Sequence, residues 1–394
     1  MKGKNKIQAR VYETYLCKDN DSIYNGNRRQ HCVNCKPVFN CAAAIRGIGC
    51  AVLLMISVFA GGCAMGGATG ENTVAGLAAL EEGSYQEAQQ LFEDAIDAGE
   101  QLMLAYRGLG LAYMGLGEYE NAIDAFEEAL ANAPSRAPSN TEDIRLYLAT
   151  AQYRMEDYED VMITCTDILN DSDEGNADAY FLRGASYLEE GQTDAAASDF
   201  DAATALESED YDLYLNIYQC YEKANLSAVG VTYLTAAQSL KGDDTEYYYN
   251  QGRIYYYLEE YEQAQQMLIS PVEEKYEPAM YLIGKVYLAL EDYTHALDIY
   301  QQIQEEFGES QECYNGLAMC AIQKEDYDTA LAYISLGLAL DGTDGRQELL
   351  FNEIVAYEGK LDFATAAGKA ETYVESYPTD EAGQKEWAFL QTRE

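Results

Sequence analysis

Basic residues and histidines are scarce in this sequence. It has 25 lysines and arginines against 68 aspartates and glutamates, and only two histidines. Residues 1–62 hold nine of the bases and three of the acids, so the rest of the chain has 16 bases, 65 acids and a net charge of −49. Such a surface repels nucleic acids and anionic membrane surfaces. We therefore expect the main body not to bind nucleic acid.

The scarcity of histidine also argues against catalysis. Beyond residue 63 the one histidine is His295, and no serine or cysteine motif accompanies it that would indicate nucleophilic catalysis. Residues 171–175, DSDEG, are similar to a calcium-binding loop, but the glycine comes one position early and the closing glutamate is missing. We expect no enzyme, no cofactor and no calcium site, and we interpret 171–175 as a turn between helices.

The ten cysteines are unevenly spread, because six of them lie at or before residue 63. The later four fall inside helical patterns, where cysteine usually acts as a small buried hydrophobe; they are Cys165, Cys220, Cys313 and Cys320. No disulfide framework follows from these spacings. Residues 31–35, HCVNC, with Cys41 nearby, supply one CxxC pair but not the second pair that tetrahedral zinc usually needs. We predict no metal site.

An uncharged segment separates the basic N-terminal extension, residues 1–46, from the acidic body. No residue between Gly47 and Gly70 is charged, and basic residues dominate the part before it, as in a signal sequence or a membrane span with its positive end inside. Residues 47–63 end in FAGGC, which resembles the lipobox of bacterial lipoproteins. The resemblance implies cleavage before Cys63, lipidation of Cys63, and a flexible linker over residues 64–73.

Two questions about this segment stay open. The uncharged run is also long enough to be a single uncleaved membrane anchor. Either interpretation places the body outside the cytoplasmic membrane, on its outer face in a bacterial cell envelope. The 46 residues before the apolar run are long for a signal sequence, which suggests a true start further downstream, at Val33. A peptide from residues 1–30 in mass spectrometry would contradict that start.

A pattern recurs throughout the body, beyond residue 74. In residues 106–134, YRGLGLAYMGLGEYENAIDAFEEALANAP, the pattern is aromatic-x2-Leu-Gly-x2-Tyr, followed by an alanine, an aromatic residue and a proline. It resembles the tetratricopeptide repeat, a helix-turn-helix unit of 34 residues. The residue expected to open the second helix recurs nine times, at Tyr85, Tyr119, Tyr158, Thr193, Ser227, Tyr261, Tyr293, Tyr327 and Phe363.

The resemblance implies an all-α, right-handed solenoid of about nine helix pairs. We expect the solenoid over residues 74–379 and a capping helix over residues 380–394, where Trp387, Phe389 and Leu390 would cover repeat nine. Small residues at repeated positions would let paired helices approach closely, and the stacked pairs would share one continuous core.

In tetratricopeptide arrays the first helix of each pair lines a concave groove, at repeat positions 2, 5, 9, 12 and 13 when the leading aromatic is position 4. This frame places five bases in the groove: Arg107, Arg154, Lys223, Arg253 and Lys285. It also places nine acids there: Asp143, Asp178, Glu189, Asp212, Glu222, Glu246, Glu312, Glu348 and Glu358. Either the bases bind a ligand's carboxylate, or they pair with the groove acids while tyrosines cover their stems.

Repeats six and seven hold the densest cluster of bases and phenols. We predict a ligand-binding site made of Tyr249, Arg253, Tyr256, Tyr257, Tyr281 and Lys285. In the stretch 244–264 the frame assigns Tyr248, Tyr255 and Tyr261 to packing positions of the repeat, and Tyr247 to the start of the helix.

The resemblance implies a non-catalytic scaffold that holds a peptide or protein partner in its groove. One alternative is a lipoprotein that binds cell-wall glycan by stacking sugars on the groove tyrosines. Another is an accessory subunit of an envelope enzyme or secretion complex. The fold alone does not name a partner.

Overall fold

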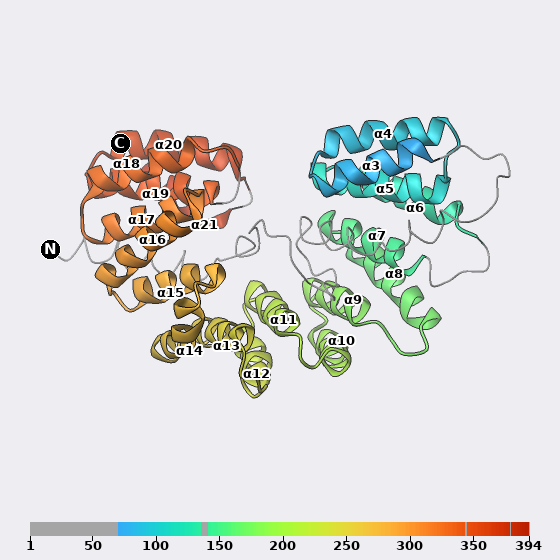
Figure 1. Ribbon diagram of the computed structural model, residues 1–394, viewed down its shortest axis with the longest axis horizontal. Coiled ribbons are helices and arrows are strands. Elements are labelled where there is room, and N and C mark those ends of the chain that lie inside the picture. The colour runs from blue at the N-terminus through green and yellow to red at the C-terminus, as the bar shows by residue number, and fades with distance from the viewer. Residues whose placement is uncertain (1–69, 135–140, 343–344, 379, 394) are drawn as a thin grey trace. The chain divides into compact units, whose positions relative to one another are not determined.

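The computed structural model describes residues 70–134, 141–342, 345–378 and 380–393, and all regular secondary structure in these residues is α-helical (Figure 1). The N-terminal extension 1–46, the apolar segment 47–63 and Cys63 lie outside the described residues. The first described helix begins at Glu71, so the last three residues of the expected linker 64–73 are helical. In the described part of the chain, no helix is both long and apolar enough to cross a membrane.

Nine helix pairs follow one another in the described residues, and each pair is joined by a short turn. The first helices are α3 (Glu71–Glu81), α5 (Leu102–Leu116), α7 (Glu142–Arg154), α9 (Ala177–Glu189), α11 (Tyr211–Lys223), α13 (Thr245–Tyr257), α15 (Glu277–Ala289), α17 (Gln311–Gln323) and α19 (Arg346–Gly359). The second helices are α4 (Tyr85–Asp97), α6 (Tyr119–Ala131), α8 (Tyr158–Asp171), α10 (Thr193–Leu206), α12 (Ser227–Gln238), α14 (Tyr261–Glu273), α16 (Tyr293–Phe307), α18 (Tyr327–Leu338) and α20 (Phe363–Ser376).

The predicted repeat frame is confirmed residue by residue. Each of the nine landmark positions is the first residue of a second helix, from Tyr85 in α4 to Phe363 in α20. In three of the nine pairs the residue before the landmark is a capping acid. Asp292, Asp326 and Asp362 each accept a hydrogen bond from a backbone N–H in the first turn of the second helix.

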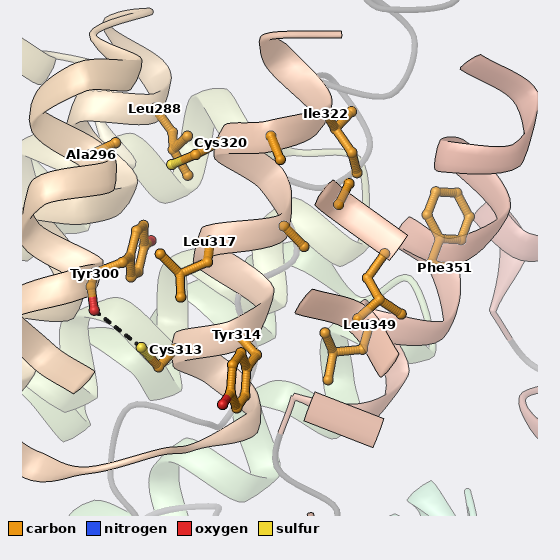
Figure 2. Close-up of a cluster of buried hydrophobic side chains, with 14 of the residues drawn as sticks. Leu288, Ala296, Tyr300, Cys313, Tyr314, Leu317, Cys320, Ile322, Leu349 and Phe351 are labelled. Carbon is orange, nitrogen blue, oxygen red and sulfur yellow. Dashed lines mark hydrogen bonds between the residues drawn. The ribbon is translucent and has the colours of Figure 1, made fainter. Parts of the chain in front are cut away.

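The described residues form two compact units that divide between residues 237 and 238, and each unit has its own core. Helix α5, for example, contacts both its own second helix, α6, and the next first helix, α7, and α15 likewise contacts α16 and α17. The core of the second unit is shown in Figure 2, where Tyr300, Leu317 and Cys320 lie among buried side chains of successive repeats.

Glycines in the first helices make room for aromatic rings from the second helices. A Cβ added to Gly284 would lie 2.7 Å from the ring of Tyr300, and one added to Gly316 would lie 2.2 Å from the same ring. Tyr300 is 2% exposed, so its ring is held between a glycine of its own repeat and a glycine of the next repeat. This contact is the physical reason for small residues in the repeat pattern.

The turn inside each pair uses the left-handed backbone conformation at one fixed position, two residues before the landmark. The nine residues there are Gly83, Gly117, Glu156, Gly191, Asn225, Glu259, Glu291, Glu325 and Leu361, and their φ angles lie between 58° and 75°. Glycine and asparagine suit this conformation, whereas a Cβ next to a left-handed backbone is strained.

Leu361 is one of the residues at this position that carry a Cβ; its φ is 62°, and its side chain is 64% exposed. We expect Leu361→Gly to stabilise the α19–α20 pair by about 1 kcal/mol, since glycine removes the strain and little buried contact is lost. Hydrogen exchange of α19 and α20 measures the change. Leu361→Ala is the control, because alanine keeps the Cβ and hence the strain. Equal protection in the two variants would contradict the prediction.

A final helix, α21 (Glu381–Leu390), packs on α20 and ends the second unit. Asp380 caps it by accepting hydrogen bonds from the backbone N–H groups of Ala382 and Gly383, and it also accepts one from the Tyr373 hydroxyl at 2.6 Å. Leu390 is fully buried, and Trp387 and Phe389 are half-buried against the same core. These contacts agree with the covering role expected of residues 380–394.

Candidate functional site

The predicted site residues of repeat six lie on α13. The helix begins at Thr245, and Asp244 caps it by accepting a hydrogen bond from the backbone N–H of Tyr247 at 2.8 Å. Tyr247 and Tyr248 pack edge to face at the start of the helix, with ring centroids 5.2 Å apart. The cap and the repeat frame together fix which face of α13 each later tyrosine occupies.

Three of the predicted groove tyrosines are buried, so their ring faces do not line an open surface. Tyr249 is fully buried, and Tyr256 and Tyr281 are 5% and 7% exposed. Tyr249 packs edge to face on Tyr276 at 5.2 Å, and the Tyr281 hydroxyl lies 2.8 Å from Oγ of Ser310 on the next first helix. Burial raises the pKa of Tyr281.

The expected division of these tyrosines between packing and groove positions therefore holds only in part: Tyr255 and Tyr261 pack against the core as expected, but Tyr249 and Tyr256, expected in the groove, belong to the core as well. The buried rings on α13 are Tyr249 and Tyr256, whereas Tyr248, Tyr255 and Tyr261 are only half-buried. The physical reason is that first helices of successive repeats contact one another, as α13 contacts α15, so part of the predicted groove face packs against a neighbouring helix.

Arg253 and Tyr257 are the two predicted site residues on α13 that keep exposed surface, because both are half-buried. The Arg253 guanidinium lies over the Tyr249 ring at 5.6 Å, and its Nη1 donates a hydrogen bond to Oδ1 of Asn250 at 3.0 Å. Tyr257 packs edge to face on Tyr256 at 5.7 Å. A buried pair of rings thus supports one arginine and one phenol at the surface.

Lys285 forms an ion pair with Glu312, with Nζ and Oε1 3.3 Å apart. The two side chains are 14% and 17% exposed, and the pair links α15 to α17. Of the two possibilities for the groove bases, binding a ligand or pairing with a groove acid, Lys285 therefore follows the second.

Two groove bases of the first unit behave in the same way. Arg107 on α5 binds Asp143 on α7 at 2.7 Å and lies over the Tyr147 ring at 5.5 Å. Lys223 on α11 binds Glu189 on α9. Each ion pair joins the first helices of two successive repeats, so these charges stabilise the contact between neighbouring repeats.

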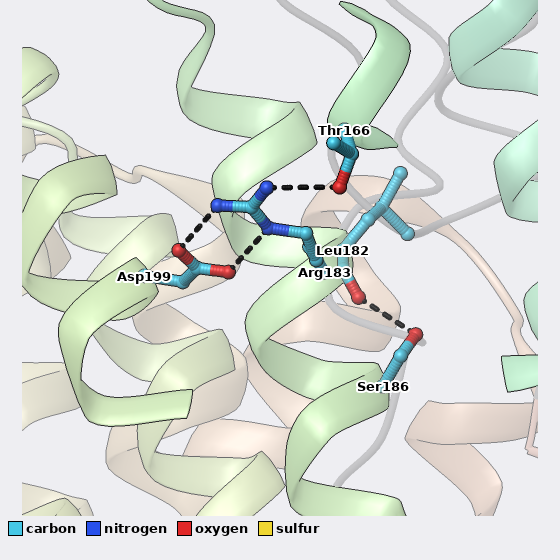
Figure 3. A network of polar contacts seen from close by, with 5 residues as sticks. All are labelled: Thr166, Leu182, Arg183, Ser186 and Asp199. Atoms are coloured by element: carbon cyan, nitrogen blue, oxygen red, sulfur yellow. Dashed lines mark hydrogen bonds and ion pairs between the residues drawn. The ribbon is translucent and has the colours of Figure 1, made fainter. Parts of the chain in front are cut away.

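A second kind of ion pair, which we did not predict, joins the two helices of one repeat. Nε and Nη2 of Arg183 on α9 donate to both carboxylate oxygens of Asp199 on α10, at 2.7 and 2.8 Å, and Nη1 donates to the Thr166 hydroxyl (Figure 3). The guanidinium also lies over the rings of Tyr180 and Tyr187. A charged residue at repeat position 7, where five of the other repeats have leucine or isoleucine, was the signal in the sequence.

Repeat nine has the same ion pair with opposite polarity. Glu353 on α19 and Lys369 on α20 occupy repeat positions 7 and 23, as Arg183 and Asp199 do in repeat four, and their charged atoms are 2.8 Å apart. Repeat positions 7 and 23, where the two helices of a repeat meet, can therefore hold an ion pair of either polarity.

The one histidine among the described residues is His295. It lies in the first turn of α16, as expected, where its Nδ1 is 2.6 Å from Oδ2 of the capping Asp292 and its ring stacks on Tyr287. Burial raises the pKa of the Cys165, Cys313 and Cys320 thiols to about 12, which suppresses the thiolate form. The described residues contain no cluster of side chains that could hold a metal ion.

Comparison with protein families supports the fold. Models of the tetratricopeptide repeat match residues 73–137, 177–210 and 245–269, and a model of the coatomer epsilon subunit matches residues 279–367. Among curated proteins, none matches this sequence.

Several solved structures resemble the chain at low sequence identity. A tetratricopeptide repeat protein from Parabacteroides merdae is 16% identical, with a TM-score of 0.46, over 74% of this chain and 99% of its own. MamA from AMB-1 is 20% identical, with a TM-score of 0.34, over 43% of this chain and 97% of its own. The P58(IPK) tetratricopeptide domain is 16% identical, with a TM-score of 0.25, over 82% of this chain and 97% of its own.

The nine helix pairs and the matched family models together show an all-α solenoid built from tetratricopeptide repeats. This fold is typically a non-catalytic scaffold for protein–protein interaction, and no enzyme family matches the sequence.

Proposed function

We propose that this chain is a lipid-anchored scaffold that binds a segment of a partner protein at the half-buried side chains of Arg253 and Tyr257 on α13. The observation that carries the proposal is the arrangement of Arg253 and Tyr257 at the surface, on a support of buried Tyr249 and Tyr256. Arginine and tyrosine are the residues that most often dominate protein–protein binding energy, above all when their geometry is fixed before binding.

The same geometry argues for a protein partner rather than a cell-wall glycan. Sugars bind by stacking on exposed aromatic faces, and three of the predicted tyrosines have no exposed face because Tyr249, Tyr256 and Tyr281 are buried. The acidic body favours a partner without a large negative charge of its own.

We expect Arg253→Glu combined with Tyr257→Ala to weaken partner binding by at least about 100-fold, because two central contact residues are lost together. Pull-down from envelope extracts and from purified cell-wall glycan measures the change. Lys324→Glu is the control, since Lys324 is an exposed lysine in the turn after α17. Binding that survives the double variant would assign the partner to another surface, and binding to glycan alone would overturn the choice of a protein.

The anchor and the location are part of the proposal and rest on the sequence around Cys63. The apolar run and the FAGGC motif support lipidation and a position on the outer face of the cytoplasmic membrane. Metabolic labelling with a palmitate analogue should label the natural chain, and Cys63→Ala should abolish the label. An unlabelled natural chain would favour an uncleaved membrane span.

A further inference from the structure

The first helix of the array, α3, has an exposed face without charge. Val74 is 48% exposed, Ala78 is exposed, and Leu77 beside them is half-buried. No residue from 72 to 80 is charged, although the chain has 65 acids beyond residue 62. A surface helix usually turns a charged or polar face to the solvent, so this face of α3 has the character of a contact surface.

The equivalent face is covered in the later repeats. Val74 and Ala78 occupy repeat positions 6 and 10, and in repeats two to nine the residues at both positions are buried, or half-buried in repeat five. Position 6 meets the second helix of the preceding repeat, since a Cβ added to Gly108 would lie 2.2 Å from the Phe92 ring. Among the described residues no repeat precedes α3, so its face lacks the cover that later repeats receive.

The length of chain before α3 determines where this face lies, a step that rests on the lipid anchor proposed above. Seven residues lead from Cys63 to Gly70, the N-cap of α3, and they reach at most about 25 Å. After cleavage, residues 64–69 are too few to supply a covering helix pair. Every anchored copy holds its α3 within the same short distance of the membrane, so the α3 faces of two copies meet at a high effective concentration.

The other end of the array disfavours head-to-tail stacking of two copies. Helix α21 covers repeat nine with the buried Leu390, whereas its exposed residues are Gln384, Lys385 and Ala388. It therefore offers little apolar surface to α3 of another copy. A contact between two α3 helices remains, and twofold symmetry closes it. First helices already contact one another within the chain, as α3 contacts α5 and α7 contacts α9.

We propose that the exposed face of α3 binds α3 of a second copy, so that the anchored chain forms a twofold dimer at the end of the array nearest the membrane. The contact covers Val74 and Ala78 on both copies and keeps charged residues out of its centre, as is usual in homodimer interfaces. The lipid surface is a poorer occupant, because Glu71, Glu81 and Glu82 flank the face and α3 has no base to attract anionic lipid.

The test uses two differently tagged copies of the full chain, produced in one cell and co-isolated in mild detergent. Ala78→Glu in both copies, or Ala78→Lys in both copies, places like charges in the contact. Ala78→Glu in one copy and Ala78→Lys in the other places opposite charges there. Ala332→Glu is the matched control, because Ala332 is an exposed alanine on α18. Circular dichroism would show that the variants keep their helices.

We expect the natural copies and the Ala332→Glu copies to co-isolate. Either Ala78 variant alone should reduce co-isolation at least about tenfold, because like charges meet in the contact, and the Glu–Lys combination should restore most of it. Natural copies that stay separate, Ala78→Glu copies that co-isolate unchanged, or a Glu–Lys combination that stays separate would overturn the proposal.

Photo-crosslinking identifies the occupant directly. The photoreactive residue p-benzoylphenylalanine in place of Val74 should join two copies of the chain. A crosslink to lipid or to a different protein, and none between copies, would overturn the choice of a second copy. Palmitate labelling of the same cells separates the dimer from the anchor. A labelled chain that does not co-isolate contradicts the dimer alone, whereas an unlabelled chain that co-isolates contradicts the anchor alone.

Discussion

Replacing Asp199 with alanine is expected to destabilise the α9–α10 pair by about 3 kcal/mol. Asp199 is 6% exposed, and both of its carboxylate oxygens accept hydrogen bonds from Arg183. The Arg183 side chain is 17% exposed, so the variant leaves a largely buried guanidinium without its counter-ion. Removing one partner of such a pair costs more than removing both, because the remaining charge is still desolvated.

The loss of stability should be confined to the neighbourhood of α9 and α10, because helix pairs in a repeat array can unfold one at a time. Hydrogen exchange in α9 and α10 should accelerate on the order of 100-fold, which corresponds to about 3 kcal/mol. Exchange in α15 to α20, in the other unit, serves as the internal reference.

The ion pair in repeat nine has the opposite polarity, so it provides the design for a double variant that should recover the lost stability. Arg183→Glu combined with Asp199→Lys copies the Glu353–Lys369 pair into repeat four and should restore most of the protection that Asp199→Ala loses. Unchanged exchange in Asp199→Ala would contradict the structural role of the pair. A double variant as unstable as the single one would show that the two repeats do not share this contact.

The second large effect is expected at Gly316. Gly316→Ala would place a Cβ 2.2 Å from Cε1 of Tyr300, whose ring is 2% exposed and packs against both Gly284 and Gly316. The ring has little room to move away, because it is 2% exposed and also lies so close to Gly284 that a Cβ there would be 2.7 Å from it. Overpacking of this kind costs about 1–3 kcal/mol, and we expect the upper end of that range. Urea denaturation and hydrogen exchange of α16 and α17 measure it.

A matched control distinguishes overpacking from helix propensity. The same change at Gly368, where a Cβ meets nothing, should stabilise α20 by about 1 kcal/mol, the ordinary advantage of alanine over glycine in a helix. Combining Gly316→Ala with Tyr300→Leu should recover part of the lost stability, since leucine lacks the clashing ring atoms. Stabilisation by Gly316→Ala would contradict the packing described here.

The fold could be predicted from the sequence because each repeat contains its own local signals for helix starts and turns. The nine landmarks, from Tyr85 to Phe363, mark where a helix begins, and all nine do begin a helix. Caps such as Asp292 and turn residues such as Gly117 act over a few residues, so they are readable locally.

The candidate site was less predictable, because it depends on contacts between repeats. Helical periodicity placed Tyr249 and Tyr256 on one face of α13, but their burial depends on how closely neighbouring helices approach. The pairing of Lys285 with Glu312 likewise depends on the spacing of α15 and α17, which no local pattern encodes. The Arg183–Asp199 pair, by contrast, was visible as a charge at an apolar repeat position.

Site-specific photo-crosslinking in cells tests the central claim, that a partner protein binds at Arg253 and Tyr257 on α13. The photoreactive residue p-benzoylphenylalanine would replace Tyr257 on α13 or, as the comparison, Gln263, which is exposed on α14 of the same repeat. We predict a crosslinked partner protein from position 257, lost when Arg253→Glu is added, and none from position 263. Crosslinks from position 263 but not from position 257 would contradict the account.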